Sequence, residues 1–246
     1  MYCKINWFDT LDSTQEEVRR HISELDNLSV TAALYQTSGK GQRGNRWDSA
    51  KGENLMFSIL LRPGSGDVPK VPAPRQFFLS LVSSLAVYHT LEDYGITSKI
   101  KWPNDIYVGN KKICGMLIEN TLGQDGGIKE SIIGIGLNVN QTDFPPQLMN
   151  PTSMARITHK EYDIKEVLDK LMGHFTALLS TPAEELSEAY LSHLFRLGER
   201  AEYVDSASGE AFQGIIKGIT DDAFLLVEIC GGETRRYAFK EISYVL

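Results

Sequence analysis

The sequence predicts an α+β protein, with a mixed β-sheet domain packed with helices and then a small β-barrel. Three observations predict this arrangement. Residues 75–94 carry apolar side chains at helical spacing, and strand-like runs flank them on both sides. Beyond Gly198 the chain becomes a series of short β-like runs separated by turn residues. We therefore expect one domain over residues 1–198 and a second over residues 199–246.

The elements of the first domain follow from local patterns in chain order. An acidic first turn at Glu16 and Glu17 predicts a helix that begins at Ser13 or Thr14. A polar, glycine-rich stretch at 37–53 predicts a long loop, and proline marks a break over 63–74. The remaining expected elements are strands at 3–8, 30–36, 54–62, 98–102, 112–119 and 131–140, the helix at 75–94, and helices at 163–179 and 183–197.

Composition limits the class of protein. The 246 residues are 42% hydrophobic and 23% charged, which is typical of a globular protein, and the net charge of -7 argues against general nucleic-acid binding. The 3 cysteines are scattered, which favours a reducing compartment over a disulfide framework. The amino terminus has no signal-peptide pattern and no apolar run reaches ~18 residues, so we expect a cytoplasmic protein without a membrane partner. No spacing identifies metal ligands.

The loop at 36–47 concentrates glycine and positive charge. Its glycines allow close backbone approach, its basic residues could bind a phosphate or carboxylate, and Trp47 could stack on a flat ring. The loop lacks a Walker A ending, and a Rossmann fingerprint would not lie between two strands. The alternative interpretation is a mobile, solvated basic loop whose tryptophan is anchored in the core. The charged and glycine residues concerned are Gly39, Lys40, Gly41, Arg43, Gly44 and Arg46.

Two further stretches have weaker patterns of their own. KWPND at 101–105 ends a strand, and by itself it is no more than a turn; Lys111 and Lys112 at a hairpin tip would usually be solvated. In IIGIGLNVN at 132–140 the isoleucine face is core, whereas the opposite face presents Gly134, Gly136 and Asn138. Bare backbone on that face indicates either a flat ligand or close packing by a neighbouring element.

Taken together, the segments resemble the biotin–protein ligase (holocarboxylase synthetase) family. The matching segments occur in the family's order, and the β-rich tail resembles its SH3-like carboxy-terminal domain. The resemblance implies a class II synthetase-like biotin–lipoate ligase fold, with ATP and Mg²⁺ as cofactors and biotin as substrate. The matching segments are LDSTQ at 11–15, QTSGKGQRGNRW at 36–47, KWPNDIY at 101–107, KKICGMLIE at 111–119 and IIGIGLNVN at 132–140.

The resemblance also implies roles for individual residues. Lys112 would bridge the biotin carboxylate and the α-phosphate, and Lys101 would support the phosphates. The biotin contacts that it implies are Ser13, Thr14, Gln15, Gln36, Gly39, Lys40, Gly41, Gln42, Lys112, Gly115 and Gly134. The adenylate contacts that it implies are Arg43, Trp47, Lys101, Asn104 and Asn138.

The expected chemistry has two steps. Clustered cations would stabilise charge at the α-phosphorus, and a closing loop would shield the reactive biotinyl-adenylate from water. The second nucleophile would be a lysine of a biotin carboxyl carrier domain, so we name Asp105 as the residue that orients or deprotonates it. Where relatives commonly read GRGRRG, this loop reads GKGQRG, so Gln42 stands where arginine is frequent.

Two alternative functions stay open from the sequence. A lipoate–protein ligase would use the same chemistry, although KWPND and the GxGxN strand favour biotin. A non-catalytic biotin sensor would bind without turnover. Some relatives carry an amino-terminal DNA-binding module, which this sequence lacks, so we expect the monofunctional form and no nucleic-acid partner. An exposed sheet edge could pair with a second copy, as a homodimer, or with the acceptor.

Overall fold

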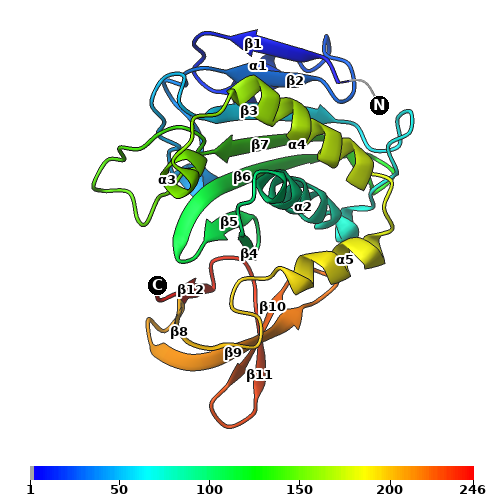
Figure 1. The fold of residues 1–246 in the computed structure, drawn as a ribbon. Helices are drawn as coiled ribbons and strands as arrows, with labels where there is room; N and C mark the ends of the chain where they lie inside the picture. The colour runs from blue at the N-terminus through cyan, green and yellow to red at the C-terminus, as the bar shows by residue number, and fades with distance from the viewer. Residues whose placement is uncertain (1–2) are drawn as a thin grey trace.

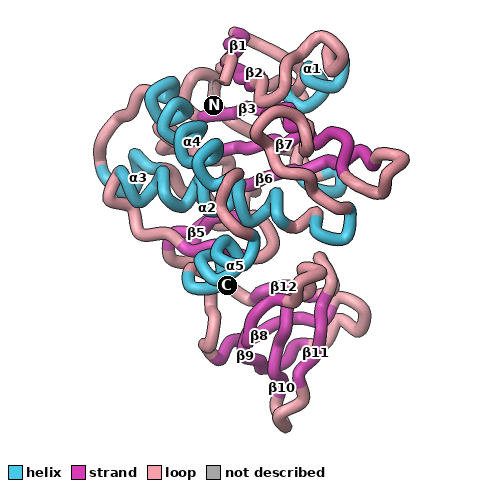
Figure 2. Tube along the Cα trace, turned by 90° about the vertical axis from the view of Figure 1, so that its right-hand side faces the viewer, coloured by secondary structure: helices cyan, strands magenta, loops and turns pink. Residues whose placement is uncertain are grey.

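The computed structural model describes residues 3–246, apart from the side chain of Arg43, and builds them into two β-sheets with helices on the larger one (Figures 1 and 2). The elements, in chain order, are β1 (Ile5–Phe8), α1 (Thr14–Arg20), β2 (Val30–Ala33), the 3₁₀ turn η1 (Gln42–Gly44), β3 (Leu55–Leu61), η2 (Ala73–Arg75), α2 (Phe78–Asp93), β4 (Lys99–Lys101), β5 (Asp105–Val108), β6 (Lys111–Leu122), β7 (Ile128–Leu137), α3 (Met154–Thr158), α4 (Ile164–Leu178), α5 (Ala183–Ser192), β8 (Arg200–Asp205), β9 (Ala211–Ile219), β10 (Leu225–Ile229), β11 (Thr234–Tyr237) and β12 (Ile242–Tyr244).

The larger sheet has seven strands in the order β1-β2-β3-β7-β6-β5-β4. β1 and β2 are parallel and every other pair is antiparallel, so the sheet is mixed, as the sequence predicts. Sequence reasoning missed β5 and α3, because each has only four or five residues and too few repeats to show a period.

Alternation along the central strands separates the two faces of this sheet. Ile133, Ile135 and Leu137 of β7 enter the main core, which also contains the buried residues of α2 and α4. On the opposite face Leu60 of β3 and Ile132 of β7 pack with Val18 of α1. Figure 1 shows α2 and α4 together over one face of the sheet. The face that carries α1 is therefore covered only in part, and it holds the site.

Five antiparallel strands in the order β11-β10-β9-β8-β12 form the second sheet. It lies beyond α5 and below the β4 end of the first sheet (Figures 1 and 2). Its first strand begins at Arg200, close to the boundary expected at Gly198. The division into two domains remains a prediction, because buried side chains of both sheets belong to one continuous cluster.

No described helix has the length and apolar character needed to cross a membrane.

Candidate functional site

A cavity of about 930 Å³ opens on the face of the larger sheet that α1 covers only in part. Its walls come from the start of α1, the glycine-rich loop, strands β4 to β7, the loop before α3 and the end of the second sheet. Segments far apart in the chain therefore converge there. Among the residues named from the sequence, the cavity is lined by Ser13, Thr14, Gln15, Gln36, Lys40, Gly41, Gln42, Trp47, Lys101, Asn104, Asp105, Lys112, Gly115, Gly134 and Asn138.

Two of the ligand contacts that the resemblance implies need separate description. Gly39 belongs to the loop but its own atoms do not line the cavity. Its role is indirect, because a Cβ at this position would lie 2.4 Å from the carbonyl oxygen of Trp47. The side chain of Arg43 falls outside the described part of the chain.

The start of α1 is fixed by its own side chains. Ser13 is the N-cap, with its Oγ accepting from the backbone N–H of Gln15 at 3.3 Å. The backbone N–H of Thr14 donates to Oε1 of Gln36 at 2.7 Å, and the Thr14 and Ser58 hydroxyls lie 2.8 Å apart. Ser13, Thr14 and Gln15 are all buried. This segment therefore presents short polar groups in a fixed, dry arrangement.

Gln15 lies against the bare backbone of Gly134. A Cβ on that glycine would lie 2.3 Å from the Gln15 side-chain oxygen, so only glycine leaves room for this amide. The Gln15 Nε2 donates to Oε2 of Glu119 at 2.7 Å and to the carbonyl of Ile132 at 3.2 Å. Oε2 of Glu119 thus holds the Gln15 amide from β6, and sequence reasoning gave this residue no role.

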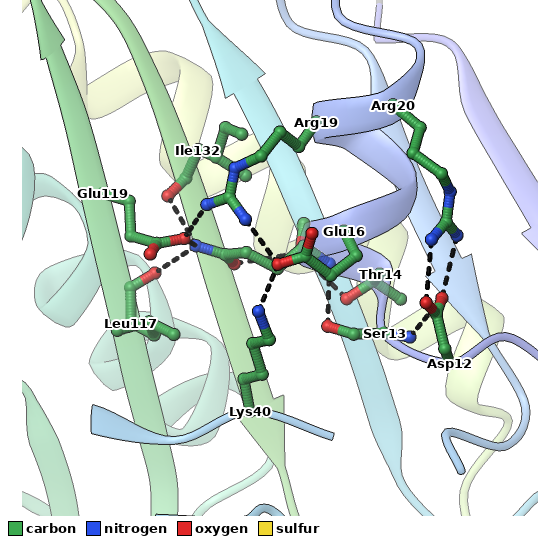
Figure 3. Close-up of polar contacts among 12 residues, drawn as sticks. Asp12, Ser13, Thr14, Glu16, Arg19, Arg20, Lys40, Leu117, Glu119 and Ile132 are labelled. Atoms are coloured by element: carbon green, nitrogen blue, oxygen red, sulfur yellow. Dashed lines mark hydrogen bonds and ion pairs between the residues drawn. The ribbon is translucent and has the colours of Figure 1, made fainter. Parts of the chain in front are cut away.

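A chain of ion pairs runs from Glu119 to the glycine-rich loop (Figure 3). Arg19 Nη2 lies 2.6 Å from Glu119 Oε2, and its other terminal nitrogen pairs with Glu16. Glu16 also pairs with Lys40 of the loop. Hydrogen bonding to Lys40 lowers the pKa of Glu16, with smaller contributions from Arg19 against an opposing effect of burial. The loop is therefore tied to α1 by charge.

The loop itself is ordered by its backbone. Trp47 N–H donates to Gly39 O at 3.0 Å, and Gly41 N–H donates to Asn45 O at 2.7 Å. Between these bonds lies the 3₁₀ turn η1, so the long loop predicted over 37–53 has local structure at its centre. Gln42 Nε2 donates to the carbonyl of Met116 at 3.2 Å, which draws the loop over β6.

Trp47 lies across two glycines of neighbouring strands. A Cβ on Gly136 would lie 2.4 Å from its ring, and one on Gly115 would lie 3.0 Å from it. These glycines are direct partners in the β6–β7 register, so together they form a flat floor. The structure shows close packing by neighbouring elements on this glycine face, and the same glycines line the cavity. The indole Nε1 is buried and has no hydrogen-bond partner among the described residues.

Lys112 and Asp105 meet on this same face. Asp105 lies opposite Gly115 in the β5–β6 register, and Lys112 Nζ lies 2.7 Å from Asp105 Oδ1. In the β5–β6 register Ile106 lies opposite Cys114, whereas the next residue, Tyr107, lies opposite Lys112. Ile113 is therefore an extra, unpaired residue in β6. Such a bulge re-aims the side chain next to it. Without it, Lys112 and Gly115 would face opposite sides of the sheet.

The segment before α3 fixes the backbone around Lys112. Lys112 N–H donates to Asn150 O at 2.7 Å, and Thr152 N–H donates to Lys112 O at 2.9 Å. The carbonyl of Thr152 also accepts from Asn138 Nδ2 at 2.9 Å. Nothing in the sequence around Asn150 and Thr152 indicates this role, because it depends on backbone groups.

Lys101 is the last residue of β4, and Asn104 lies in the turn after it. Asn104 is buried and its Nδ2 donates to the carbonyl of Met116 at 2.7 Å, the same carbonyl that Gln42 reaches. Lys101 is half-buried, with Nζ 3.3 Å from the Tyr107 hydroxyl. Burial lowers the pKa of Lys101, while Asp105 opposes this change and Lys112 and Arg196 add to it. This part of the site therefore combines the ammonium groups of Lys101 and Lys112 with the amide of Asn104.

The described residues contain no group of three or more histidine, cysteine, aspartate or glutamate side chains that could hold a metal. The carboxylates that line the cavity are Asp48 and Asp105. Such a site suits a metal ion that arrives with a phosphate ligand, because Mg²⁺ usually takes only one or two protein carboxylates there.

Known proteins are similar in sequence and in fold. The pattern of the biotin/lipoate A/B protein ligase family matches residues 7–138. The bifunctional ligase/repressor BirA of Bacillus subtilis is 32% identical over 94% of this chain and 71% of its own length. The biotin–[acetyl-CoA-carboxylase] ligase of Paracoccus denitrificans is 30% identical over 88% of this chain and 90% of its own.

A solved structure covers both sheets. The biotin protein ligase from Aquifex aeolicus in complex with biotin and ATP superimposes with a TM-score of 0.80 at 28% identity. The match spans 98% of this chain and 97% of that one, so the similarity includes the small carboxy-terminal sheet.

Proposed function

Because the chain belongs to the biotin/lipoate A/B protein ligase family, we infer that it is an ATP-dependent biotin–protein ligase. It activates biotin as biotinyl-5'-AMP and then transfers biotin to a lysine of an acceptor protein. The named relatives and the solved biotin–ATP complex support biotin over lipoate as the substrate, and a catalyst over a sensor. The observation on this chain that supports the inference most is the cavity, because residues of all five sequence segments line it.

In the first step a biotin carboxylate oxygen attacks the α-phosphorus of ATP and pyrophosphate leaves. Two anions must approach each other, so fixed cations lower the barrier most where charge develops. We propose that Lys112 is the cation between carboxylate and α-phosphate. Its support is its place on the cavity floor beside Gly115, where it is paired only with Asp105 among the described acidic residues.

The polar start of α1 would bind the ureido ring. The backbone of buried Thr14 is hydrogen-bonded to Gln36, buried Ser13 caps the same helix start, and Gln15 beside Gly134 closes it on the strand side. Short, buried polar groups already held in place are suited to recognise a small neutral ring, because little ordering is required on binding.

The loop from Gly39 to Trp47 would cover the intermediate. A mixed anhydride is lost to water unless the site excludes solvent. The loop is held by Lys40 on Glu16 just before η1 and by Gln42, the first residue of η1, on Met116 O. Trp47, Asn104 and Asn138 would then lie on the adenylate side, with Arg43 nearby in sequence.

Magnesium would enter bound to ATP and supply charge neutralisation at the phosphates. Asp105 and Asp48 are the side-chain carboxylates that line the cavity.

In the second step the acceptor lysine attacks the carbonyl carbon of the anhydride and AMP leaves. The nucleophile must be a neutral amine, so a nearby carboxylate that accepts its proton accelerates transfer. We assign this role to Asp105, which is ion-paired with Lys112 at the cavity floor. A biotin carboxyl carrier domain is the proposed acceptor, and the cytoplasm is the proposed compartment, because the 3 scattered cysteines suit a reducing environment.

A direct test is pyrophosphate exchange into ATP with purified protein. Biotin should support exchange and yield biotinyl-adenylate by mass spectrometry, whereas lipoate should not. Adding a carrier domain should then release AMP and increase the acceptor mass by one biotinyl group. Exchange with lipoate alone would replace the assignment by the lipoate ligase, and biotin binding without exchange would replace it by the sensor.

A further inference from the structure

Lys101 holds a charge that no acidic side chain of the described chain neutralises by ion pairing. Its ammonium lies between two tyrosine rings, 4.8 Å from the centroid of Tyr107 and 4.7 Å from that of Tyr244. The Tyr107 hydroxyl is its hydrogen-bond partner at 3.3 Å. Ring faces attract a cation without cancelling its charge. Lys101 therefore keeps its positive field available to the cavity that it lines.

The two rings come from different sheets. Tyr107 belongs to β5 of the larger sheet, whereas Tyr244 belongs to β12 at the end of the second sheet. Tyr244 pairs with Tyr203 in the β8–β12 register, and their rings meet edge to face with centroids 5.3 Å apart. Its hydroxyl is buried and has no partner among the described residues. The ring is thus held by packing alone.

We call the contact region around Lys101, between the two sheets, the seam. Hydrogen bonds fix the chain there on both sides of Lys101. Before it, Ile100 N–H donates to His193 O at 2.9 Å, and Phe195 N–H donates to Ile100 O at 2.8 Å. After it, the indole N–H of Trp102 donates at 3.0 Å to the carbonyl of Ala223, in the turn between β9 and β10. A lysine side chain has four flexible bonds and samples many rotamers when free. Here two rings on a fixed seam restrict it.

We propose that Tyr244 is a positioning residue that holds the Lys101 ammonium toward the nucleotide phosphates, so that the second sheet completes the ATP half of the site. This inference rests on the proposed ligase function. Lys240, Ile242 and Ser243 of the same sheet also line the cavity, so the second sheet already forms part of its wall. ATP binding then depends on the seam, whereas biotin binding at the start of α1 does not.

The test removes the aromatic ring of Tyr244 but keeps a side chain of considerable size. Tyr244→Met should raise the KM for ATP in pyrophosphate exchange about tenfold, since a cation–π contact with a partly desolvated amine is of that order. The Kd for biotin should stay at its wild-type value. Tyr244→Phe keeps the ring face and should keep the KM for ATP, because the hydroxyl has no partner. An equal loss in both variants, or no loss in Tyr244→Met, would overturn the proposal.

Two controls separate this role from general damage to the second sheet. Phe212→Leu alters an aromatic contact of the same sheet, with Tyr203 and Tyr237, but does not touch the cavity; it should leave both constants unchanged. Lys101→Met should raise the KM for ATP, and adding Tyr244→Met should raise it no further, because both act through one ammonium. Additive effects would contradict the proposal even if Tyr244→Met lowers stability.

The result that would refute the proposed ligase function differs from the result that would refute the role of Tyr244. Wild-type protein without biotin-dependent exchange would refute the ligase assignment. Wild-type exchange with a Tyr244→Met variant of unchanged KM would refute only the role of Tyr244.

Discussion

The ammonium of Lys112 lies 2.7 Å from the carboxylate of Asp105, and one extra residue in β6 brings them together. Both side chains are about one third exposed, at 32% and 28%. Substrates can therefore reach the pair, and an incoming biotin carboxylate could take the place of Asp105 as the partner of Lys112.

Lys112→Ala should abolish adenylation, because no other fixed cation stands at that point of the floor. We expect a fall of roughly 100-fold or more in biotin-dependent pyrophosphate exchange, as for removal of other transition-state stabilisers. Lys111→Ala is the matched control, since that neighbouring side chain is exposed at the hairpin. Unchanged adenylation in Lys112→Ala would refute the central assignment.

Asp105→Asn should separate the two steps. The amide keeps the size of the side chain but cannot accept the proton of an acceptor lysine. Transfer from preformed biotinyl-adenylate should slow by about 100-fold or more. Adenylation should change less, because Lys112 remains. Transfer at the wild-type rate would show that Asp105 has no part in the second step.

Gly136→Ala should expel Trp47 from the strand floor. The new methyl would lie 2.4 Å from the ring, which the structure must relieve by shifting the loop. We expect a loss of about 1–3 kcal/mol in the free energy of unfolding, measured by denaturant titration. Gly173→Ala in α4 is the control, since its methyl would meet nothing and helix propensity favours alanine by about 1 kcal/mol. A stable Gly136→Ala variant would mean that Trp47 does not rest on this strand.

ATP affinity should weaken in alkaline solution sooner than an ordinary lysine would predict. Burial disfavours the charged ammonium and lowers the pKa of Lys101; Lys112 and Arg196 act in the same direction, and Asp105 acts against it. As the pH rises through that lowered pKa, the charge is lost and phosphates bind less well. The Kd of a non-hydrolysable ATP analogue, measured from about pH 7 to about pH 10, should rise in wild type. Lys101→Arg should remove this rise, because guanidinium stays charged. The same rise in both proteins would assign it to another group.

Short-range sequence patterns predicted most of the first domain. The core face of β7 and the capped start of α1 at Ser13 were confirmed, because strand alternation and N-capping act within a few residues. The helix predicted over 183–197 ends at Ser192 instead, after which the chain turns to pair with β4. That pairing is tertiary and leaves no local pattern.

The site was predictable to the extent that its residues share motifs. Lys112 and Asp105 were named together from the sequence, yet the bulge that joins them is invisible there, because it depends on how β5 registers against β6. Glu119 and Tyr244 were missed altogether. Glu119 ends the KKICGMLIE segment but was given no role, and Tyr244 lies outside every motif; each acts on a residue more than a hundred positions away.

The sequence by itself determined the fold class, the family and many of the residues around the cavity, because turn chemistry, periodicity and ordered motifs are local properties. Only the tertiary structure decided which of them touch. The bulge turned Lys112 to the side of Asp105, the bare backbones of Gly115 and Gly136 received Trp47, and the seam placed Tyr244 on Lys101. Each of these contacts is set by register and packing between distant segments, whose energies no single segment contains.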